Sequence, residues 1–442
     1  MSMMSMGMNA ERDAAATAHA RAYGERLLGE VKEENLAELL RTLHALHAPS
    51  PADPQYSPLG IKPLDDILRV YHLPQTATSI YTPPQPVLEI TSPSSADGKT
   101  HLLYHITALA VLPRTYRNIH LAGRGSAIVF LDADGRFDAL RLREIAGGIV
   151  HERAREQGIS LAADRNRGVG RGDDGYDGNE VEENIDVNTM LRTALSHVHV
   201  FRPQSSVSLL AALHSLESYL LGENVGHASH CRPLHAILLD SASAFYWQDR
   251  REVEILSIPG VREERERERE PLASNDKEGD SAANITTASQ LPHKIIAALR
   301  ALQRTFSCPL VFTTWGLQRA PARSHYSHAT TTTATQLYVP NRPSFRPHLP
   351  RPWPSFPTCR IVVQRDSVRP FAPLLGLQEV KEREAGWRQQ VVARGMVVGW
   401  IDWMMSAGGG REEGRMGERV FGFSLKKGGV EWVDGDEGEM LV

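Results

Sequence analysis

Cysteine is scarce in this chain of 442 residues, long apolar runs are missing, and neither sign of charge predominates. Its three cysteines lie far apart and form no C-x-x-C pair, which excludes a disulfide framework and favours a reducing compartment. No apolar run reaches the roughly 18 residues of a membrane span, and the first residues lack the pattern of a secretory signal, so we expect neither. A formal net charge of −4 excludes a protein that is basic all over, so any contact with nucleic acid needs a local basic patch.

Apolar runs of strand length alternate with helix-length segments from residue 87 onward. This order predicts an α/β fold with a mostly parallel central sheet flanked by helices. The expected strands are Val87–Thr91, Ala127–Asp132, His197–Arg202, Ala236–Asp240, Pro309–Thr314, Thr358–Arg365 and a pair within Arg419–Val433. The expected helices between them are Lys99–Leu112, Phe137–Arg155, Ser205–Leu221 and Leu291–Thr305.

An N-terminal helix is predicted over residues 11–47, where leucines recur at three- and four-residue steps and line one face. Packing of that face on the protein's own core is favoured over docking to a partner. Three polar or low-complexity segments are predicted to be surface insertions or disordered loops: 163–186, 262–280 and 318–357. The expected organisation is a helical segment and linker over 1–58, one core over 59–433, and a tail over 434–442.

Gly98-Lys99-Thr100 stands where a predicted strand gives way to a predicted helix. In such a loop, glycine lets backbone N–H groups face phosphate oxygens, lysine reaches the β and γ phosphates, and the hydroxyl holds Mg²⁺. The loop before it fits less well. Pro93 occupies a position where the full pattern has glycine, and Asp97 brings negative charge near the phosphates. The tripeptide alone therefore leaves a chance match open.

A second segment strengthens the prediction of a nucleotide site. Ala236–Asp240 consists of four apolar residues and an aspartate, the pattern of a buried strand whose aspartate binds Mg²⁺ at the carboxyl edge of a sheet. The alternative is an aspartate that caps the next helix. Gly98, Lys99, Thr100 and Asp240 together predict an ATP site, with Thr100 and Asp240 on the Mg²⁺ ion.

Hydrolysis would also need a group that orients the attacking water. Asp132 and Asp134 close the predicted strand Ala127–Asp132 and are the candidates at a suitable edge. Both side chains are shorter than glutamate, so their reach is limited.

These segments resemble the eukaryotic RecA-like recombinases, which implies a RecA-like P-loop core. Leu59–Leu68 is similar to the lead-in of that core, Val87–Ile90 to its first strand and Gly98–Thr100 to the end of Walker A. Val129–Gly135 resembles the strand that carries the catalytic carboxylate, which falls on Asp134, and Leu238–Ser241 resembles Walker B.

The resemblance is strongest to one branch of recombinase paralogues, the X-ray repair cross-complementing proteins of group two. It rests on Lys99–Ala108, His214–Tyr219, Asp240–Trp247, Phe345–Leu349 and Gly429–Trp432, of which Asp240–Trp247 is the most specific. It implies a nuclear protein that joins other recombinase paralogues, chiefly the D-type one. The assembly would bind single-stranded or branched DNA and assist recombinase loading in double-strand-break repair by homologous recombination.

Two departures from the family pattern imply weak or absent ATP hydrolysis. The phosphate-loop glycine is missing, and Trp315 stands where recombinases carry a glutamine that senses the γ-phosphate. An indole donates one hydrogen bond and accepts none, so it cannot replace an amide. Two alternatives stay open: an active P-loop ATPase or kinase, and a stand-alone single-stranded-DNA-binding module.

A basic interval follows the predicted strand Pro309–Thr314. No Asp or Glu occurs between Asp280 and Asp366, whereas ten Lys or Arg residues do, with aromatic residues interleaved. Such a segment suits single-stranded DNA, because cations meet phosphates and rings stack on bases. The predicted DNA contacts are Arg319, Arg323, Arg342, Arg346 and Arg351. A solvated, disordered insertion explains the composition equally well.

Overall fold

The computed structural model describes residues 17–28, 57–72, 85–159, 178–222, 226–258, 281–318, 345–347, 349–365, 385–405 and 420–433, together with 36, 39, 43, 161, 376, 378, 411 and 412. The chain divides into two units, residues 1–47 and 48–442. In the first unit the predicted helix is present over 17–28 and at 36, 39 and 43. Leu36, Leu39 and Leu43 are exposed within this unit, so the packing of that face stays a prediction.

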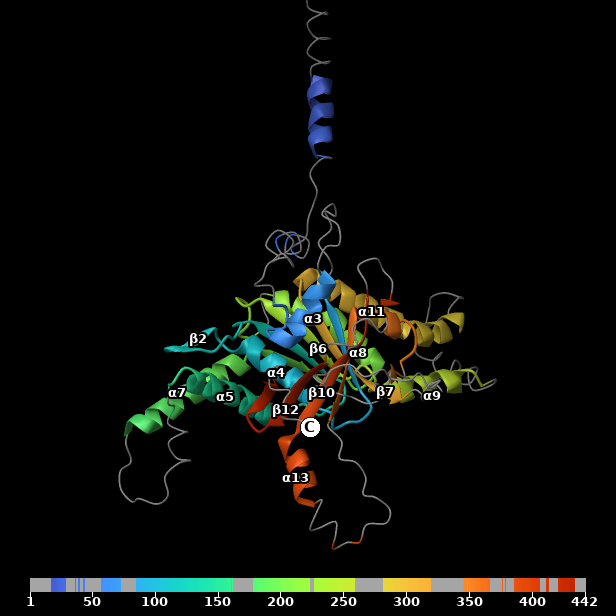
Figure 1. The fold of residues 1–442 in the computed structure, drawn as a ribbon. Coiled ribbons are helices and arrows are strands. Elements are labelled where there is room, and N and C mark those ends of the chain that lie inside the picture. Colours follow the sequence, from blue (N-terminus) through green and yellow to red (C-terminus); the bar gives the residue numbers. More distant parts are fainter. Residues whose placement is uncertain are drawn as a thin grey trace, which may run out of the picture. The chain divides into compact units, whose positions relative to one another are not determined.

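The second unit is built on a mixed sheet with the strand order β13-β12-β10-β9-β1-β7-β6-β4-β5 (Figure 1). Its parallel part consists of β1 (Val87–Ser92), β4 (Ala127–Asp132), β5 (Val198–Phe201), β6 (Leu234–Asp240), β7 (Leu310–Gln318) and β9 (Cys359–Arg365). An antiparallel extension follows, formed by β10 (Met396–Met405), β12 (Val420–Lys426) and β13 (Gly429–Val433). Short strands are β2 (Thr115–Tyr116), β3 (Ile119–His120), β8 (Phe345–Pro347) and β11 (Arg411–Glu412). The predicted α/β, RecA-like class is confirmed.

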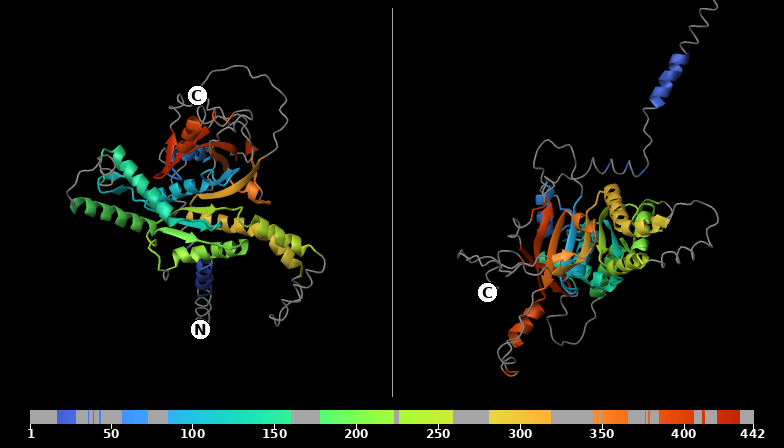
Figure 2. Two further views of the ribbon diagram at one scale, coloured as in Figure 1. Left: turned by 90° about the horizontal axis from the view of Figure 1, so that it is seen from below. Right: turned by 90° about the vertical axis from the view of Figure 1, so that its right-hand side faces the viewer.

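Helices cover both faces of this sheet (Figures 1 and 2). One hydrophobic core lies under α3 (Lys62–His72), α4 (Lys99–Val111), α5 (Ala139–Glu156) and α7 (Gly178–Leu195). The other lies under α8 (Ser206–Leu221), α11 (Ser281–Phe306) and the short 3₁₀ helix η2 (Trp353–Ser355). The remaining helices are α9 (Tyr246–Leu256) and α13 (Ala385–Arg394). Among the described helices, none is long and apolar enough to cross a membrane.

Local sequence explains the ends of several helices. The Asp138 side chain accepts hydrogen bonds from the backbone N–H groups of Leu140 (2.9 Å) and Arg141 (3.1 Å), so α5 begins with a capped turn. Ser205 and Ser208 form a reciprocal capping box at the start of α8. These caps satisfy N–H groups that have no partner inside the helix.

The structure differs from two of the predicted insertions. Residues 178–186, expected in a loop, belong to α7. Residues 349–357, expected in the third insertion, contribute Trp353 and Phe356 to the second core, where both pack around Phe312 with ring centroids 5.5 and 5.7 Å away. The burial of these two aromatic side chains keeps the segment on the core, although its proline-rich composition predicted a surface insertion. Residues 262–280 lie outside the described residues.

Burial of two histidines makes stability depend on pH. Desolvation lowers the pKa of His105 and of His235 to about 4. The unfolded chain gains these protons near pH 6.5 whereas the folded chain does not, so stability is full above pH 6.5 and falls as the pH drops toward 4. Between pH 6.5 and 5 each histidine should cost roughly 2 kcal/mol of unfolding free energy. Urea denaturation across this range checks this, and His105→Leu should remove only the His105 share of the loss, because burial lowers the pKa of His199 to about 4 as well; an unchanged slope would contradict it.

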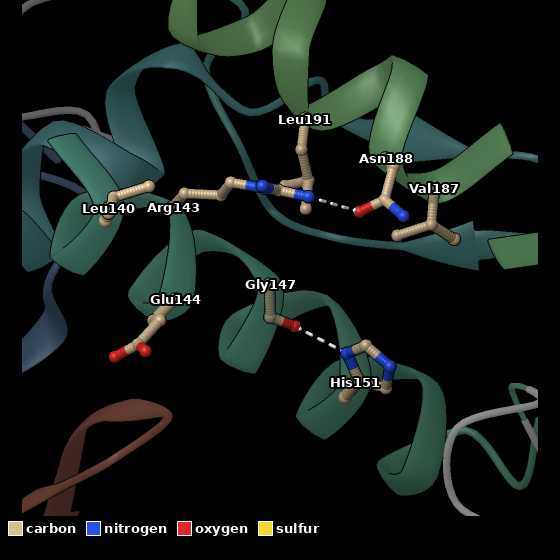
Figure 3. A pocket seen from close by; sticks show the side chains of 8 residues that line it. All are labelled: Leu140, Arg143, Glu144, Gly147, His151, Val187, Asn188 and Leu191. Atoms are coloured by element: carbon tan, nitrogen blue, oxygen red, sulfur yellow. Dashed lines mark hydrogen bonds between the residues drawn. The ribbon is translucent and has the colours of Figure 1, made fainter. Parts of the chain in front are cut away.

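An open groove of about 370 Å³ lies between α5 and α7 (Figure 3). Leu140, Gly147, Val187 and Leu191 supply its apolar part, and Arg143 spans it to donate a hydrogen bond to Asn188 at 2.9 Å. None of the residues predicted to bind nucleotide lines this groove. The candidate site lies instead at the carboxyl edge of the sheet.

Candidate nucleotide site

The sheet brings the predicted nucleotide residues to one edge. β1 pairs with β7, β7 with β6, and β6 with β4, all in parallel. Their carboxyl ends therefore lie side by side, which is where open α/β sheets bind ligands. Asp240 at the end of β6 is in register with Asp132 at the end of β4.

Gly98 begins the helix after β1 in a conformation that disfavours other residues. It has φ 86° and ψ 4°, in the left-handed region. An added Cβ would also lie 3.0 Å from Leu425 Cδ1. Asp97, the apparent defect of the loop, is buried and accepts hydrogen bonds from the N–H groups of Ser94 (3.0 Å) and Arg365 (3.1 Å). Its charge therefore fixes the loop conformation.

Lys99 and Thr100 point into this edge from the first turn of α4. The buried Lys99 ammonium donates hydrogen bonds to Ser92 Oγ and to the Ser94 carbonyl, the latter at 3.1 Å. Burial lowers its pKa, and the charges of Asp97, Asp240 and Asp134 oppose that shift. The ammonium thus lies within a loop that ends at a helix N-terminus, the arrangement that suits a phosphate anion.

Thr100 and Asp240 meet directly. Thr100 Oγ1 donates to Asp240 Oδ2 at 2.7 Å, and Thr313 Oγ1 donates to the other carboxylate oxygen at 2.5 Å. The hydroxyl and the carboxylate are oxygen ligands of the kind Mg²⁺ takes. No cluster of three or more His, Cys, Asp or Glu side chains suited to a metal occurs in the described residues. A Mg²⁺ ion here would therefore draw its remaining ligands from phosphate and water, as in most nucleotide sites.

The two candidates for orienting water have different environments. Asp132 is buried and accepts hydrogen bonds from the N–H groups of Arg136 (2.9 Å) and Phe137 (3.0 Å) and from Arg202 Nε (3.1 Å). Its carboxylate is thus committed to the turn after β4. Among the described residues, Asp134 accepts one weak side-chain hydrogen bond, from Ser241 Oγ at 3.3 Å, and burial together with the charge of Asp240 raises its pKa. Of the two, Asp134 is the carboxylate available to water or to a cation.

Trp315 lies where the resemblance predicted it, just beyond the Thr313–Asp240 contact. Its side chain is 45% exposed, and its backbone N–H donates to Ser243 Oγ at 3.2 Å. The side chain of Thr314 turns the other way and donates to Glu89 Oε1 at 2.7 Å. Sequence reasoning missed Ser92, Thr313 and Glu89; the one available signal was a glutamate inside the apolar run of β1.

The predicted DNA contacts are only partly described. Arg319, Arg323 and Arg342 lie outside the described residues. Arg346 belongs to β8, which pairs with the end of β7. Arg351 is exposed just before η2. The structure therefore leaves the grouping of these arginines as a prediction.

Comparison with known proteins gives the family context. No family model matches the chain. It is 22% identical over 292 residues to the DNA repair protein XRCC2 homolog of Arabidopsis thaliana, a match that covers 64% of this chain and 69% of that protein. It is 27% identical over 154 residues to DNA repair protein XRCC2 of Mus musculus, covering 35% of this chain and 38% of the mouse protein. Together with the sheet order and the convergence of Lys99, Thr100 and Asp240, these matches support an XRCC2-like recombinase paralogue with a RecA-like fold.

Proposed function

We propose that the chain acts in repair of DNA double-strand breaks by homologous recombination, as a subunit of an assembly with other recombinase paralogues. The similarity to two DNA repair proteins supports the repair role. The observation that carries the molecular proposal is the direct contact of Thr100 with Asp240, 140 positions apart, beside the buried Lys99. Chance occurrences of Gly98-Lys99-Thr100 and of an apolar run ending in Asp240 would not be expected to meet in this way.

At this edge the proposed ligand is Mg²⁺ with ATP. Lys99 would meet the β and γ phosphates, while Thr100 and Asp240 would hold the ion. Bound Mg²⁺ would supply positive charge that offsets the phosphates, and it would relieve the repulsion between Asp134 and Asp240 that raises the Asp134 pKa. The residues present fit this ligand.

The same residues argue for slow hydrolysis. Asp134 has a shorter side chain than the glutamate that would orient water best, so its reach toward an attacking water is limited. Trp315 offers an indole N–H and no acceptor beside Thr313. The proposed role of the nucleotide is therefore to stabilise one conformation of the carboxyl edge of the sheet. The protein would act mainly by forming a complex with other paralogues, and ATP hydrolysis would contribute little.

DNA is the proposed second ligand, bound by the basic interval that begins after β7. Trp315 supports this proposal, because a large aromatic side chain 45% exposed at the start of the interval offers a stacking surface. No Asp or Glu lies between Asp280 and Asp366, so the arginines at 319, 323, 342, 346 and 351 have no acidic neighbour within that stretch of sequence. Single-stranded DNA is the ligand that offers both phosphates for the cations and unpaired bases for the aromatic ring.

Affinity purification from cells with damaged DNA tests the proposal. The full-length tagged chain should recover other recombinase paralogues, and Lys99→Ala should recover them in equal amount, because assembly does not depend on hydrolysis. Lys294→Ala, which changes an exposed lysine of α11, is the matched control. The purified assembly should also bind single-stranded DNA with an affinity that falls steeply as salt rises.

Recovery of no paralogue by the wild type would overturn the proposed assembly. A flat salt response would overturn the proposed DNA contact. Rapid ATP turnover that Lys99→Ala abolishes would favour an active ATPase.

A further inference from the structure

The tip of the β12–β13 hairpin, residues 425–429, lies against the start of α4 and along the N-terminal half of α5. Leu425 faces Gly98, since a Cβ on Gly98 would lie 3.0 Å from Leu425 Cδ1. Gly428 lies so close to α5 that a Cβ on Gly148 would come within 2.0 Å of the Gly428 carbonyl oxygen. A segment more than 320 positions away in sequence thus covers the outer side of the phosphate loop.

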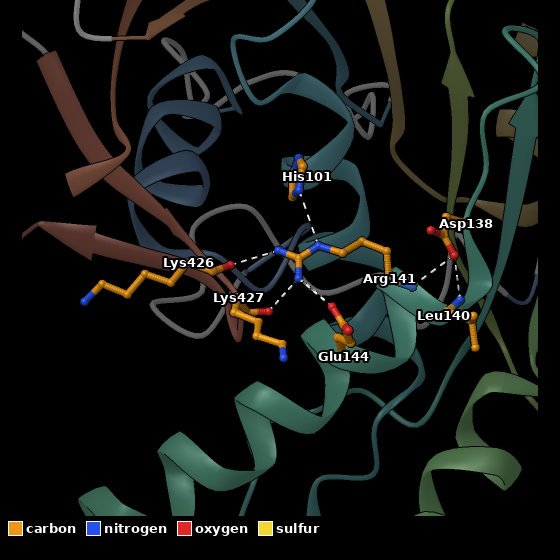
Figure 4. Close-up of polar contacts among 7 residues, drawn as sticks. All are labelled: His101, Asp138, Leu140, Arg141, Glu144, Lys426 and Lys427. Carbon is orange, nitrogen blue, oxygen red and sulfur yellow. Dashed lines mark hydrogen bonds and ion pairs between the residues drawn. The ribbon is translucent and has the colours of Figure 1, made fainter. Parts of the chain in front are cut away.

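Arg141 in the first turn of α5 holds this tip in place (Figure 4). Its guanidinium donates to the Lys427 carbonyl at 2.6 Å and to the Lys426 carbonyl at 2.8 Å. It also pairs with Glu144 at 2.9 Å, and its Nε lies 3.4 Å from His101 Nε2. One side chain therefore joins α5, the hairpin tip and the residue that follows Thr100.

The chemistry of this contact needs arginine. A planar guanidinium carries five N–H donors in a fixed fork, so it can reach two neighbouring carbonyls and a carboxylate at once. An ammonium cannot reproduce that geometry.

We infer that Arg141 is a positioning residue for the phosphate loop, acting through the β12–β13 hairpin tip. It holds Leu425 against Gly98, which supports the left-handed conformation of that glycine and thereby the direction of Lys99 and Thr100. The inference rests on the proposed nucleotide site. It gives the antiparallel extension of the sheet a function, because that extension ends on the loop that would bind phosphate.

Arg141→Ala in the full-length chain is the test. We expect Mg·ATP to bind about tenfold more weakly, because a small displacement of positioned groups is costly. We also expect faster amide hydrogen exchange at residues 98–102 without nucleotide. Arg141→Lys should lie between the wild type and Arg141→Ala, and it serves as the milder variant if alanine impairs folding.

Arg300→Ala is the matched control. Arg300 also donates to a backbone carbonyl, that of Phe356 at 2.9 Å, but it lies over the Phe356 ring beside the core on the other face of the sheet. Its loss should lower the melting temperature without changing Mg·ATP affinity or exchange at 98–102. If Arg141→Ala and Arg300→Ala behave alike in both measurements, Arg141 is merely structural and the inference is wrong.

A double-mutant cycle tests the route through the hairpin. If Arg141 acts through Leu425, then Arg141→Ala and Leu425→Ala should have non-additive effects on hydrogen exchange at 98–102. Strictly additive effects would refute that route. If the wild type binds no Mg·ATP, the proposed nucleotide site fails, and the exchange measurements alone decide whether Arg141 positions the loop.

Discussion

Replacing Arg360 with alanine should lower the free energy of unfolding by about 3–5 kcal/mol, the range for breaking a buried ion pair. Arg360 Nε donates to Glu89 Oε2 at 2.8 Å, and the two side chains are 5% and 1% exposed. Arg360 also lies 3.5 Å from Asp402, and Glu89 accepts from Thr314. The loss is large because the variant leaves the Glu89 carboxylate buried without its cation.

The protonation state of Glu89 decides by which route Arg360→Ala lowers the free energy of unfolding. Burial raises the pKa of Glu89, while the charge of Arg360 and the hydrogen bonds lower it. Without Arg360 the pKa should rise further, so the folded state either takes up a proton or keeps an uncompensated charge. Both outcomes destabilise the fold at neutral pH.

Urea denaturation measures the effect, and a partly exposed pair provides the matched control. Arg69 and Asp66 lie 3.3 Å apart on α3, where their side chains are 34% and 46% exposed. Arg69→Ala should cost less than about 1 kcal/mol. The double variant Glu89→Gln, Arg360→Met should regain part of the loss, because the buried Glu89 charge is then removed together with that of Arg360. Equal losses for Arg360→Ala and Arg69→Ala would contradict the assigned environment of Glu89.

The parallel part of the sheet was predictable from sequence because each strand is a short apolar run bounded by polar residues. Val87–Thr91 and Ala236–Asp240 differ from the observed strands by one or two residues. Burial on both faces makes such strands nearly uninterrupted apolar runs, which local inspection detects. Asp240 could be placed for the same reason, since the polar residue that ends such a run lies at the sheet edge.

Other parts depend on contacts that sequence order hides. β10 was missed, and the resulting position of the β12–β13 hairpin against Gly98 and Arg141 was not foreseeable. Nothing near Arg141 in the sequence indicates that its partners are the carbonyls of residues 426 and 427. Trp353 and Phe356 were assigned to an insertion because their neighbours are rich in proline. Only the three-dimensional proximity of Phe312 explains their burial.

The candidate site was likewise predictable from sequence only in part. The types of Lys99, Thr100 and Asp240 predicted a phosphate and magnesium site, and the structure brings these three side chains together. Sequence did not separate Asp132 from Asp134, because both follow the same strand. The hydrogen bonds from the backbone and from Arg202 commit Asp132 to a turn and leave Asp134 as the available carboxylate.

Mg·ATP binding to the purified full-length chain, measured by titration calorimetry, tests the central claim most directly. Lys99→Ala should weaken binding by about 100-fold, equivalent to about 2.7 kcal/mol, because it removes a charge-assisted contact with phosphate. Asp240→Asn should remove most of the dependence on Mg²⁺, and Lys294→Ala should bind like the wild type. Absence of binding by the wild type, or equal affinity of the wild type and Lys99→Ala, would contradict a nucleotide site at the ends of β1 and β6.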